Sequence, residues 1–403
     1  MFKTIGMASG LGLALGLGLE VSLLSRGHTL AHPSTLLVMQ ESSLSSPSTA
    51  TKADSTVASS WTTAPATTIA MEAERFSLSS SGERLLTSPF AGNEFQVWNT
   101  QTGELLTEVS SDRTTRFDAL AISNDGTQVA AVVQTAQTQL LELWLWNIDT
   151  GEPLWKTPLG TLQGQFRDEA GFVFGMSPHL AFRPGDDLIV SQIYFGFDAA
   201  DRPSDLQLSL HDVTSGEVAQ TLETPSNDLY YDFEFSPDGT LLAGVVLGIF
   251  GLEPGKNNSV QVWQLSDGEL IHTLDSDGDD ALSNAFGFVD MVFTGEESLT
   301  VLAQHLYDIR LNTWNPQTGE RVAHTTDLPS IDRQDRAGQL SPDGRYYYVR
   351  SDYTGTRVIN LRDREVTALE GLHHRAVFSN SGNTLAIATP ETIQIFFKAD
   401  PKE

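Results

Sequence analysis

From residue 75 to the C-terminus, hydrophobic and polar residues alternate in short runs that are separated by turn-forming stretches. Runs such as "LLAGVVL" from Leu241 and "SVQVW" from Ser259 are rich in β-branched residues, which suit the pleated surface of a sheet. No segment of this region has the sustained period of an amphipathic helix. The pattern therefore predicts an all-β domain.

A short apolar strand followed by a turn of Ser, Pro, Asp, Asn or Gly recurs seven times. The copies are "FSLSSSG" from Phe76, "LAISNDG" from Leu120, "LAFRPGD" from Leu180, "FEFSPDG" from Phe233, "MVFTGEE" from Met291, "GQLSPDG" from Gly338 and "AVFSNSG" from Ala376. The fourth residues of successive copies are 38 to 60 positions apart. A period of this length indicates a repeat architecture in which each repeat is one supersecondary unit.

A second phrase follows six of the seven turns. It reads "WNTQTGELL" from Trp98, "WNIDTGEPL" from Trp146, "HDVTSGEVA" from His211, "WQLSDGELI" from Trp263, "WNPQTGERV" from Trp314 and "INLRDREVT" from Ile359. Its Gly lies where a tight hairpin needs a positive φ. Each unit is thus strand, short turn, strand, variable loop, strand, Gly-bearing turn and strand. Four antiparallel strands make one propeller blade, so seven units predict a seven-bladed β-propeller.

These phrases resemble the repeats of the WD40-like propeller family over residues 75 to 398. The resemblance implies the fold but not the specific partners of that family. Trp is followed here by Asn or Gln rather than Asp, the Gly-His dipeptide survives only in "GLHH" from Gly371, and the Asp before each Trp strand is mostly missing. We therefore expect the family's buried network of Ser or Thr, His, Asp and Trp to be absent.

Ring closure gives a role to an isolated apolar segment. The seventh unit has strands near 375–379, 384–389 and 392–398, after which only a tail of residues 399–403 remains. Its outer strand is missing, and in the WD40-like family the N-terminal segment commonly supplies it. Residues 61–71 contain Trp61 and Ile69, so we predict that they pair with residues 392–398 and leave no open sheet edge.

The N-terminal residues predict export and a tether. In residues 1–31, Lys3 precedes an apolar run, and "HTLA" offers small residues for a peptidase, which is the layout of a signal peptide. A membrane anchor from Thr4 to Leu24 is the alternative. Residues 32–60 are Ser- and Thr-rich and predict a disordered linker. The propeller of residues 61–398 is thus expected to be periplasmic, secreted or on the outer side of a membrane.

Charge and cysteine content exclude several classes of protein. The chain has 403 residues, 52 acidic and 24 basic, with a formal net charge of −28. Such a charge repels phosphate backbones and anionic lipid, so we expect no nucleic-acid partner, and membrane contact only through an uncleaved N-terminal anchor. The chain has no cysteine, which excludes disulfides, thiolate metal sites and lipidation on Cys.

Catalytic signatures are absent from the sequence, which contains no GxSxG, P-loop, HExxH or strand-following GxGxxG motif. "DSDGDDALSNAF" from Asp275 matches the first calcium-ligand positions of an EF-hand loop, but the sixth and twelfth residues are Asp280 and Phe286 rather than Gly and Glu. "NIDTGEPLWKTPL" from Asn147 resembles a quinoprotein propeller repeat, without a recognisable central cofactor site. We expect no catalytic residues, no metal and no cofactor, and leave calcium binding by the Asp275 loop open.

The variable loops are the expected binding region, because binding residues concentrate on loops above a rigid scaffold. Short turns lie on one face of the ring and the variable connections on the other, which we call the long-loop face. Its aromatic, Arg and carboxylate residues are the candidate partner-binding set: Arg167, Tyr230, Tyr231, Asp277, Asp279, Arg333, Asp335 and Arg336. We predict a protein-binding or scaffold module and no enzyme. An extracytoplasmic propeller enzyme or ligand-binding protein, quinoprotein-like or metal-assisted, is the alternative.

Overall fold

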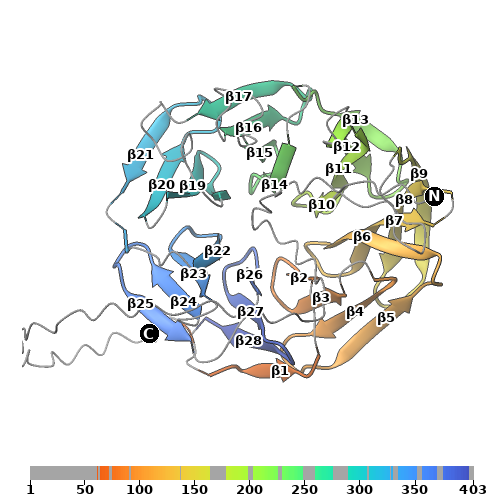
Figure 1. Ribbon diagram of the computed structural model, residues 1–403, viewed down its shortest axis with the longest axis horizontal. Helices are drawn as coiled ribbons and strands as arrows, with labels where there is room; N and C mark the ends of the chain where they lie inside the picture. Colours follow the sequence, from red (N-terminus) through yellow and green to blue (C-terminus); the bar gives the residue numbers. More distant parts are fainter. Residues whose placement is uncertain are drawn as a thin grey trace, which may run out of the picture. The chain divides into compact units, whose positions relative to one another are not determined.

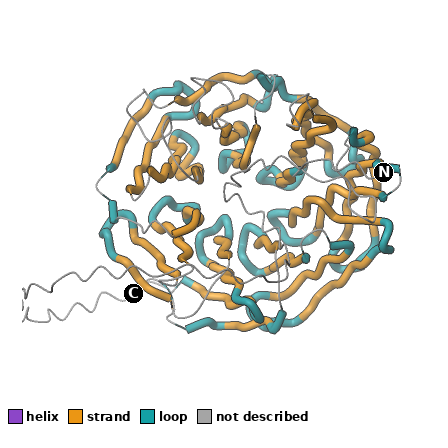
Figure 2. The backbone as a smooth tube through the Cα atoms, in the orientation of Figure 1, coloured by secondary structure: helices purple, strands orange, loops and turns teal. Residues whose placement is uncertain are grey.

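The computed structural model describes residues 61, 64–71, 75–89, 92–136, 138–163, 178–197, 203–225, 229–247, 259–275, 289–305, 308–326, 328–329, 335–351, 356–369 and 375–398. All of them belong to the unit Val57–Glu403. They form strands, turns and loops (Figure 2). Among them, no helix is long and apolar enough to cross a membrane. The predicted signal peptide or anchor and the predicted linker lie outside the described residues.

Seven four-stranded antiparallel sheets form the blades of a β-propeller (Figure 1). Blade 1 consists of β2 (Arg75–Leu78), β3 (Arg84–Ser88), β4 (Glu94–Asn99) and β5 (Leu105–Ser110). Blade 2 consists of β6 (Thr115–Ile122), β7 (Gln128–Thr135), β8 (Leu140–Asn147) and β9 (Pro153–Thr161). Blade 3 consists of β10 (His179–Phe182), β11 (Leu188–Phe197), β12 (Pro203–Asp212) and β13 (Val218–Thr221). The predicted all-β, seven-bladed fold is confirmed.

The remaining four sheets follow the same order. Blade 4 consists of β14 (Leu229–Phe235), β15 (Leu241–Leu247), β16 (Ser259–Gln264) and β17 (Leu270–Asp275). Blade 5 consists of β18 (Val289–Gly295), β19 (Ser298–His305), β20 (Asp308–Trp314) and β21 (Arg321–Thr325). Blade 6 consists of β22 (Asp335–Leu340), β23 (Tyr346–Ser351), β24 (Thr356–Asn360) and β25 (Val366–Leu369). Blade 7 consists of β26 (Arg375–Phe378), β27 (Thr384–Ala388), β28 (Ile393–Phe397) and β1 (Thr67–Ile69).

The N-terminal strand β1 closes the ring as predicted. It pairs antiparallel with β28, with Thr67 opposite Ile395 and Ile69 opposite Ile393. Trp61 forms a bridge with Lys398 and packs its ring against Tyr346 and Phe378, at centroid distances of 6.2 and 5.8 Å. Blade 7 therefore combines strands from both ends of the folded domain, and its outer edge is paired.

The hydrophobic core consists of seven separate clusters, each between two neighbouring blades. The cluster between blades 4 and 5, for example, joins Leu241 and Val262 to Met291 and Leu299, and the cluster between blades 7 and 1 joins Ile393 to Phe76. Equivalent clusters lie at the other five boundaries. We call each boundary a joint and name it by its blades, so the cluster of Met291 lies in joint 4/5. Stability thus comes mainly from contacts between neighbouring repeats.

The first repeated phrase forms the same turn in most blades because its Ser closes the turn with a hydrogen bond. In five blades the hydroxyl of this Ser is buried and accepts a hydrogen bond from the backbone N–H five residues later, at 2.9 to 3.1 Å. In the "SPDG" turn of blade 4, Ser236 also donates to Asp238 at 2.6 Å. Hydrogen bonds from Ser236 and Thr240 lower the pKa of Asp238, although burial opposes this effect. The phrase is therefore structural.

The Gly of the second phrase has the predicted positive φ, between 70° and 80° at Gly103, Gly151, Gly216, Gly268 and Gly319. Blade 6 carries Arg364 at this position, with a φ of 62°. A side chain in the left-handed region costs about 1 kcal/mol, which Gly avoids. The sixth turn keeps its shape because Arg364 N–H donates to Asn360 O at 2.8 Å.

Replacing Arg364 with Gly is expected to stabilise the protein by about 0.5 kcal/mol, because relief of the left-handed strain exceeds the extra entropy of Gly in the unfolded chain. Urea unfolding measures the change. Gly319→Ala, in the equivalent turn of blade 5, is the matched comparison and should destabilise, since its Cβ would lie 2.8 Å from Nδ1 of His272. A loss of stability in Arg364→Gly would contradict the expectation.

Two pairs of side chains resemble parts of the buried Ser/Thr, His, Asp and Trp network that we expected to be absent. In blade 1, the Trp98 indole donates to the Thr87 hydroxyl at 3.0 Å. In blade 3, Ser191 and His211 lie 2.9 Å apart, and His211 stands where blades 1, 2, 4 and 5 have Trp. Each is a single pair rather than the network of four groups, because the hydroxyl on the second strand and the ring on the third can pair without the missing Asp.

Candidate functional site

The inner strands β2, β6, β10, β14, β18, β22 and β26 surround the centre of the ring (Figure 1), and each packs against the inner strand of the next blade. Each is also an edge strand of its sheet, so the N–H and C=O groups that face the centre of the ring have no strand partner. Side chains of the neighbouring blade bind several of them. Arg75 donates to the carbonyl of Asp118 at 2.8 Å, and Gln339 accepts from the N–H of Phe378 at 3.0 Å.

Charged residues gather on the inner strands of blades 3, 4 and 5. His179 is the first residue of β10, and its Nε2 lies 3.7 Å from Oδ1 of Asp232 on β14. Glu234 lies two residues further along β14. Asp290, on β18, is 5% exposed and accepts a hydrogen bond of 2.5 Å from the N–H of Leu340 on β22. Three carboxyl groups and one imidazole, those of Asp232, Glu234, Asp290 and His179, therefore share one part of the inner wall, which we call the charged sector.

Burial and like charge favour the neutral forms of these groups. Burial, then repulsion from Asp232 and Asp290, raises the pKa of Glu234 to about 8. Burial and repulsion from Asp232 raise the pKa of Asp290 to about 8, although the N–H groups of Leu340 and Met291 oppose this. Burial also raises the pKa of Asp232, against the attraction of His179, and lowers the pKa of His179 itself. The sector can therefore take up or release protons near neutral pH.

The sector contains no recognisable metal centre. No three His, Asp or Glu side chains of the described residues converge closely enough to hold a metal ion. Nearly all of the loop that begins at Asp275 lies outside the described residues; Asp275 itself ends β17. Calcium binding by that loop stays an open question.

Of the binding residues predicted from the sequence, the structure describes the side chain of one, Tyr230. Tyr230 is 6% exposed; its ring stacks on Phe233 at 5.2 Å, and its hydroxyl donates to Gln261. This ring therefore packs in joint 3/4 rather than on the surface, because it falls on the apolar side of β14. The backbone of Tyr231 belongs to β14, and the backbones of Asp335 and Arg336 belong to β22, but their side chains lie outside the description. Arg167, Asp277, Asp279 and Arg333 lie outside it entirely.

The charged sector was missed at the sequence level, although a signal for it exists. In "YYDFEFSPDG", Asp232 and Glu234 alternate with Phe233 and Phe235, which are buried. Counted back from the turn Ser or its equivalent, His179, Asp232 and Asp290 all lie four residues before it. Aligning the seven repeats on that turn would have brought these three residues to one level of the inner wall.

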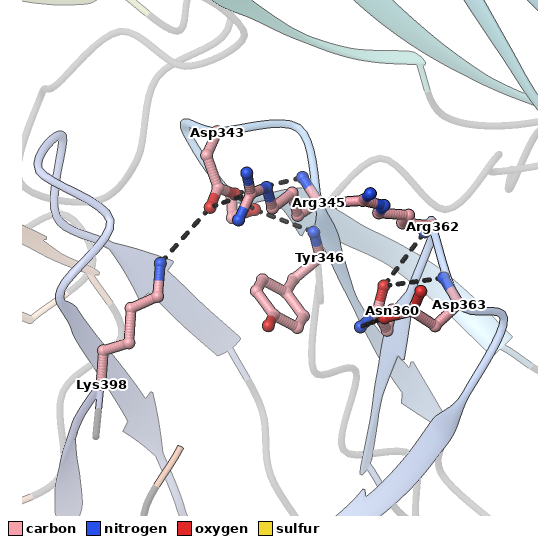
Figure 3. Close-up of polar contacts among 8 residues, drawn as sticks. Asp343, Arg345, Tyr346, Asn360, Arg362, Asp363 and Lys398 are labelled. Atoms are coloured by element: carbon pink, nitrogen blue, oxygen red, sulfur yellow. Dashed lines mark hydrogen bonds and ion pairs between the residues drawn. The ribbon is translucent and has the colours of Figure 1, made fainter. Parts of the chain in front are cut away.

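On the short-turn face near blade 6, the carboxylate of Asp343 is held by neighbouring groups of the chain (Figure 3). Asp343 accepts hydrogen bonds from Ser341 at 2.6 Å and from the N–H of Arg345 at 3.1 Å. Lys398 of blade 7 reaches the same carboxylate at 3.4 Å (Figure 3). Burial raises the pKa of Asp343, but hydrogen bonds from Ser341 and Arg345 and the charge of Lys398 give a net lowering. This turn thus serves to fasten blade 6 to blade 7.

The seven four-stranded blades define a seven-bladed β-propeller with a WD40-like fold. The chain is similar to a chain in the crystal structure of the mitotic checkpoint complex, with a TM-score of 0.54 and 14% sequence identity, covering 90% of this chain and 100% of that one. At this identity the likeness shows the fold alone. No protein-family model matches the sequence, and no curated protein matches it.

Proposed function

We propose that this protein is an exported interaction module that binds a protein partner through its long-loop face. The fold is compatible with this role, since propellers are rigid scaffolds for variable loops. The observation that carries the proposal is the difference between the two faces. The short turns bind their own polar groups, as Ser236 does with Asp238, whereas the charged residues His179 and Arg375 begin inner strands at the opposite face.

Export rests on the N-terminal sequence alone, and the partner's identity is open. A negatively charged protein favours partners with complementary positive surface, because charge complementarity speeds association and suppresses wrong partners. The predicted residues Arg167, Arg333 and Arg336 would supply specific contacts to carboxylate and carbonyl oxygens of the partner. Arginine is enriched at the centres of such interfaces.

Affinity capture from the native envelope tests the proposal. The variant Arg167→Ala, Arg333→Ala, Arg336→Ala is expected to recover at most about a tenth of the partner bound by the parent, since centrally placed Arg residues often contribute about 1.4 kcal/mol or more to binding. Arg345→Ala with Arg362→Ala is the matched control on the short-turn face, where both residues are exposed (Figure 3). Equal loss in both variants, or in neither, would exclude the long-loop face.

The alternative is a ligand-binding or catalytic propeller. The grouping of His179, Asp232, Glu234 and Asp290 favours it, because perturbed pKa values concentrate at functional sites. Under this alternative, a small molecule would raise the melting temperature of the parent but not that of Glu234→Gln. A ligand that stabilises both variants equally would not be bound by this sector.

A further inference from the structure

Polar contacts between blades are unequally distributed around the ring. On the short-turn face, the N–H of Ser381 donates to Ser80 O at 2.9 Å, and the N–H of Ser80 donates to Asn124 O at 3.0 Å. Asp186 then accepts from the N–H groups of Asn124 and Asp125 at 2.7 and 2.9 Å. A continuous chain of hydrogen bonds therefore joins the first turns of blades 7, 1, 2 and 3.

Blades 4, 5 and 6 lack this chain within the described turns. The residue that follows the turn Ser is Pro237 in blade 4 and Pro342 in blade 6, and Pro has no N–H to donate. Blade 5 has Gly295 at the same position. Among these three described turns, no hydrogen bond joins one turn to the next. The ring is thus divided into a fastened arc, blades 7 to 3, whose first turns are joined to one another, and an unfastened arc, blades 4 to 6, whose first turns are not. Blade 6 remains attached to blade 7 through Asp343 and Lys398.

Within the unfastened arc, joint 4/5 differs from its neighbours. Joint 3/4 is crossed by the hydrogen bond from the N–H of Tyr230 to the Tyr194 hydroxyl, at 2.9 Å, and joint 5/6 by the bond from Leu340 to Asp290. Between β14 and β18, by contrast, no hydrogen bond or ion pair joins two side chains among those that the structure describes, which leave out Leu229, Tyr231 and Val289. The outer contact from His272 Nε2 to Gln317 O, at 2.8 Å, and apolar packing hold this joint.

The same joint brings like charges together. β14 carries Asp232 and Glu234, and β18 carries Asp290. An opposing charge comes from β26 through Arg375, which acts on Asp232 over a longer distance. His179 on β10 lies 3.7 Å from Asp232, but burial lowers its pKa and favours the neutral imidazole. The neighbouring strand β15, from Leu241 to Leu247, is entirely apolar and glycine, and β22 offers the backbone N–H of Leu340 to Asp290. Ionisation therefore adds repulsion across a joint that has little polar attachment.

We propose that the ring has a built-in opening seam between β14 and β18, and that loss of protons from Asp232, Glu234 and Asp290 drives blades 4 and 5 apart at the inner wall. The elevated pKa values of Glu234 and Asp290 place this transition near and above neutral pH. Opening would widen the inner wall towards the long-loop face. The proposal stands whether or not that face binds a protein.

Hydrogen exchange with mass spectrometry, corrected for intrinsic exchange rates, tests the seam at about pH 6 and about pH 9. Protection in β14 and β18 is expected to fall at least about tenfold relative to β2 and β6 in the fastened arc. Glu234→Gln with Asp290→Asn should abolish this difference, and the new amide of residue 290 can still accept from Leu340. Glu269→Gln with Glu320→Gln, exposed on outer turns of the same two blades, should leave the difference intact. A uniform loss of protection, or the same local loss in the double amide variant, would overturn the proposal.

Spin labels give a second readout in the otherwise unchanged chain, which has no cysteine of its own. Pro237→Cys with Glu297→Cys places labels on the first turns of blades 4 and 5, which adjoin the inner strands β14 and β18, and Glu83→Cys with Thr127→Cys places them on the first turns of blades 1 and 2. All four positions are exposed. Raising the pH should lengthen or broaden the distance across blades 4 and 5 only. An unchanged distance there, or equal changes in both pairs, would contradict the seam.

Discussion

Ile69→Ala is expected to lower the free energy of unfolding by about 3 kcal/mol, the usual cost of truncating a fully buried Ile. Ile69 is 2% exposed and packs in joint 7/1 with Phe76, Leu85 and Ile393. It also lies on β1, the strand that closes the ring. Truncation therefore leaves a cavity and weakens the attachment of the N-terminal strand, and urea unfolding followed by tryptophan fluorescence measures the loss.

Thr68→Ala is the matched control, because Thr68 is exposed on the same strand and pairs through its backbone with Gln394. It should change the stability by about 0.5 kcal/mol or less. Detachment of β1 in Ile69→Ala would also uncover the outer edge of β28, so we expect concentration-dependent association in that variant alone. Identical unfolding curves for the two variants would mean that β1 does not close the ring in solution.

Glu234→Gln is expected to stabilise the protein by about 2 kcal/mol at about pH 9 and to leave it nearly unchanged at about pH 5. The pKa of Glu234 rises from 4.5 to about 8 on folding, so the folded state holds this proton more firmly than the unfolded state. Each pKa unit corresponds to about 1.4 kcal/mol, and the partial exposure of Glu234 to water reduces the total effect.

The direction of this dependence follows from proton linkage. Stability from the protonated Glu234 is complete below pH 4.5 and is lost as the pH rises through about 8. The turn carboxylates Asp238 and Asp343 act in the opposite sense, since their lowered pKa values give stability that is lost when acid protonates them in the folded state. We therefore expect maximum stability in mild acid rather than at neutral or alkaline pH.

Melting temperatures measured from about pH 5 to about pH 9 test both statements. The parent should lose stability across this range, and Glu234→Gln should lose distinctly less. Glu269→Gln removes an exposed glutamate of the same blade and should follow the parent. If Glu234→Gln and the parent gave parallel curves, the carboxyl group of Glu234 would have the same proton affinity in the folded and unfolded states.

Much of the fold could be predicted because its signals are local. The turn Ser residues, such as Ser236, and the Gly residues at positive φ, such as Gly216, act within a few residues of chain, so each repeat carries its own signature. Counting strands showed that the last blade lacked one, and the resemblance to WD40-like propellers implied that the segment of Trp61 and Ile69 supplies it. Arg364 could not be recognised as a left-handed residue, because neighbouring hydrogen bonds hold a conformation that its own type disfavours.

The candidate site was less accessible to sequence reasoning. Tyr230 was expected on the long-loop face, yet its position on β14 places its ring in the apolar cluster of joint 3/4. The residues of the charged sector are separated by more than a hundred positions along the chain, from His179 to Asp290. Their pKa values depend on burial and on one another, and neither can be known before the blades are in place.

The sequence by itself determined the repeat, the number of blades, the turn chemistry and the strand that closes the ring, because each depends on local conformational preference or on strand count. Only the tertiary structure decided which polar groups meet. It brought Asp232, Glu234 and Asp290 onto adjacent inner strands. It also joined the turns of blades 7 to 3, while joint 4/5 is held by apolar packing and the outer contact of His272 with Gln317. Electrostatic energies depend on distance and on the exclusion of water, and both are properties of the assembled ring.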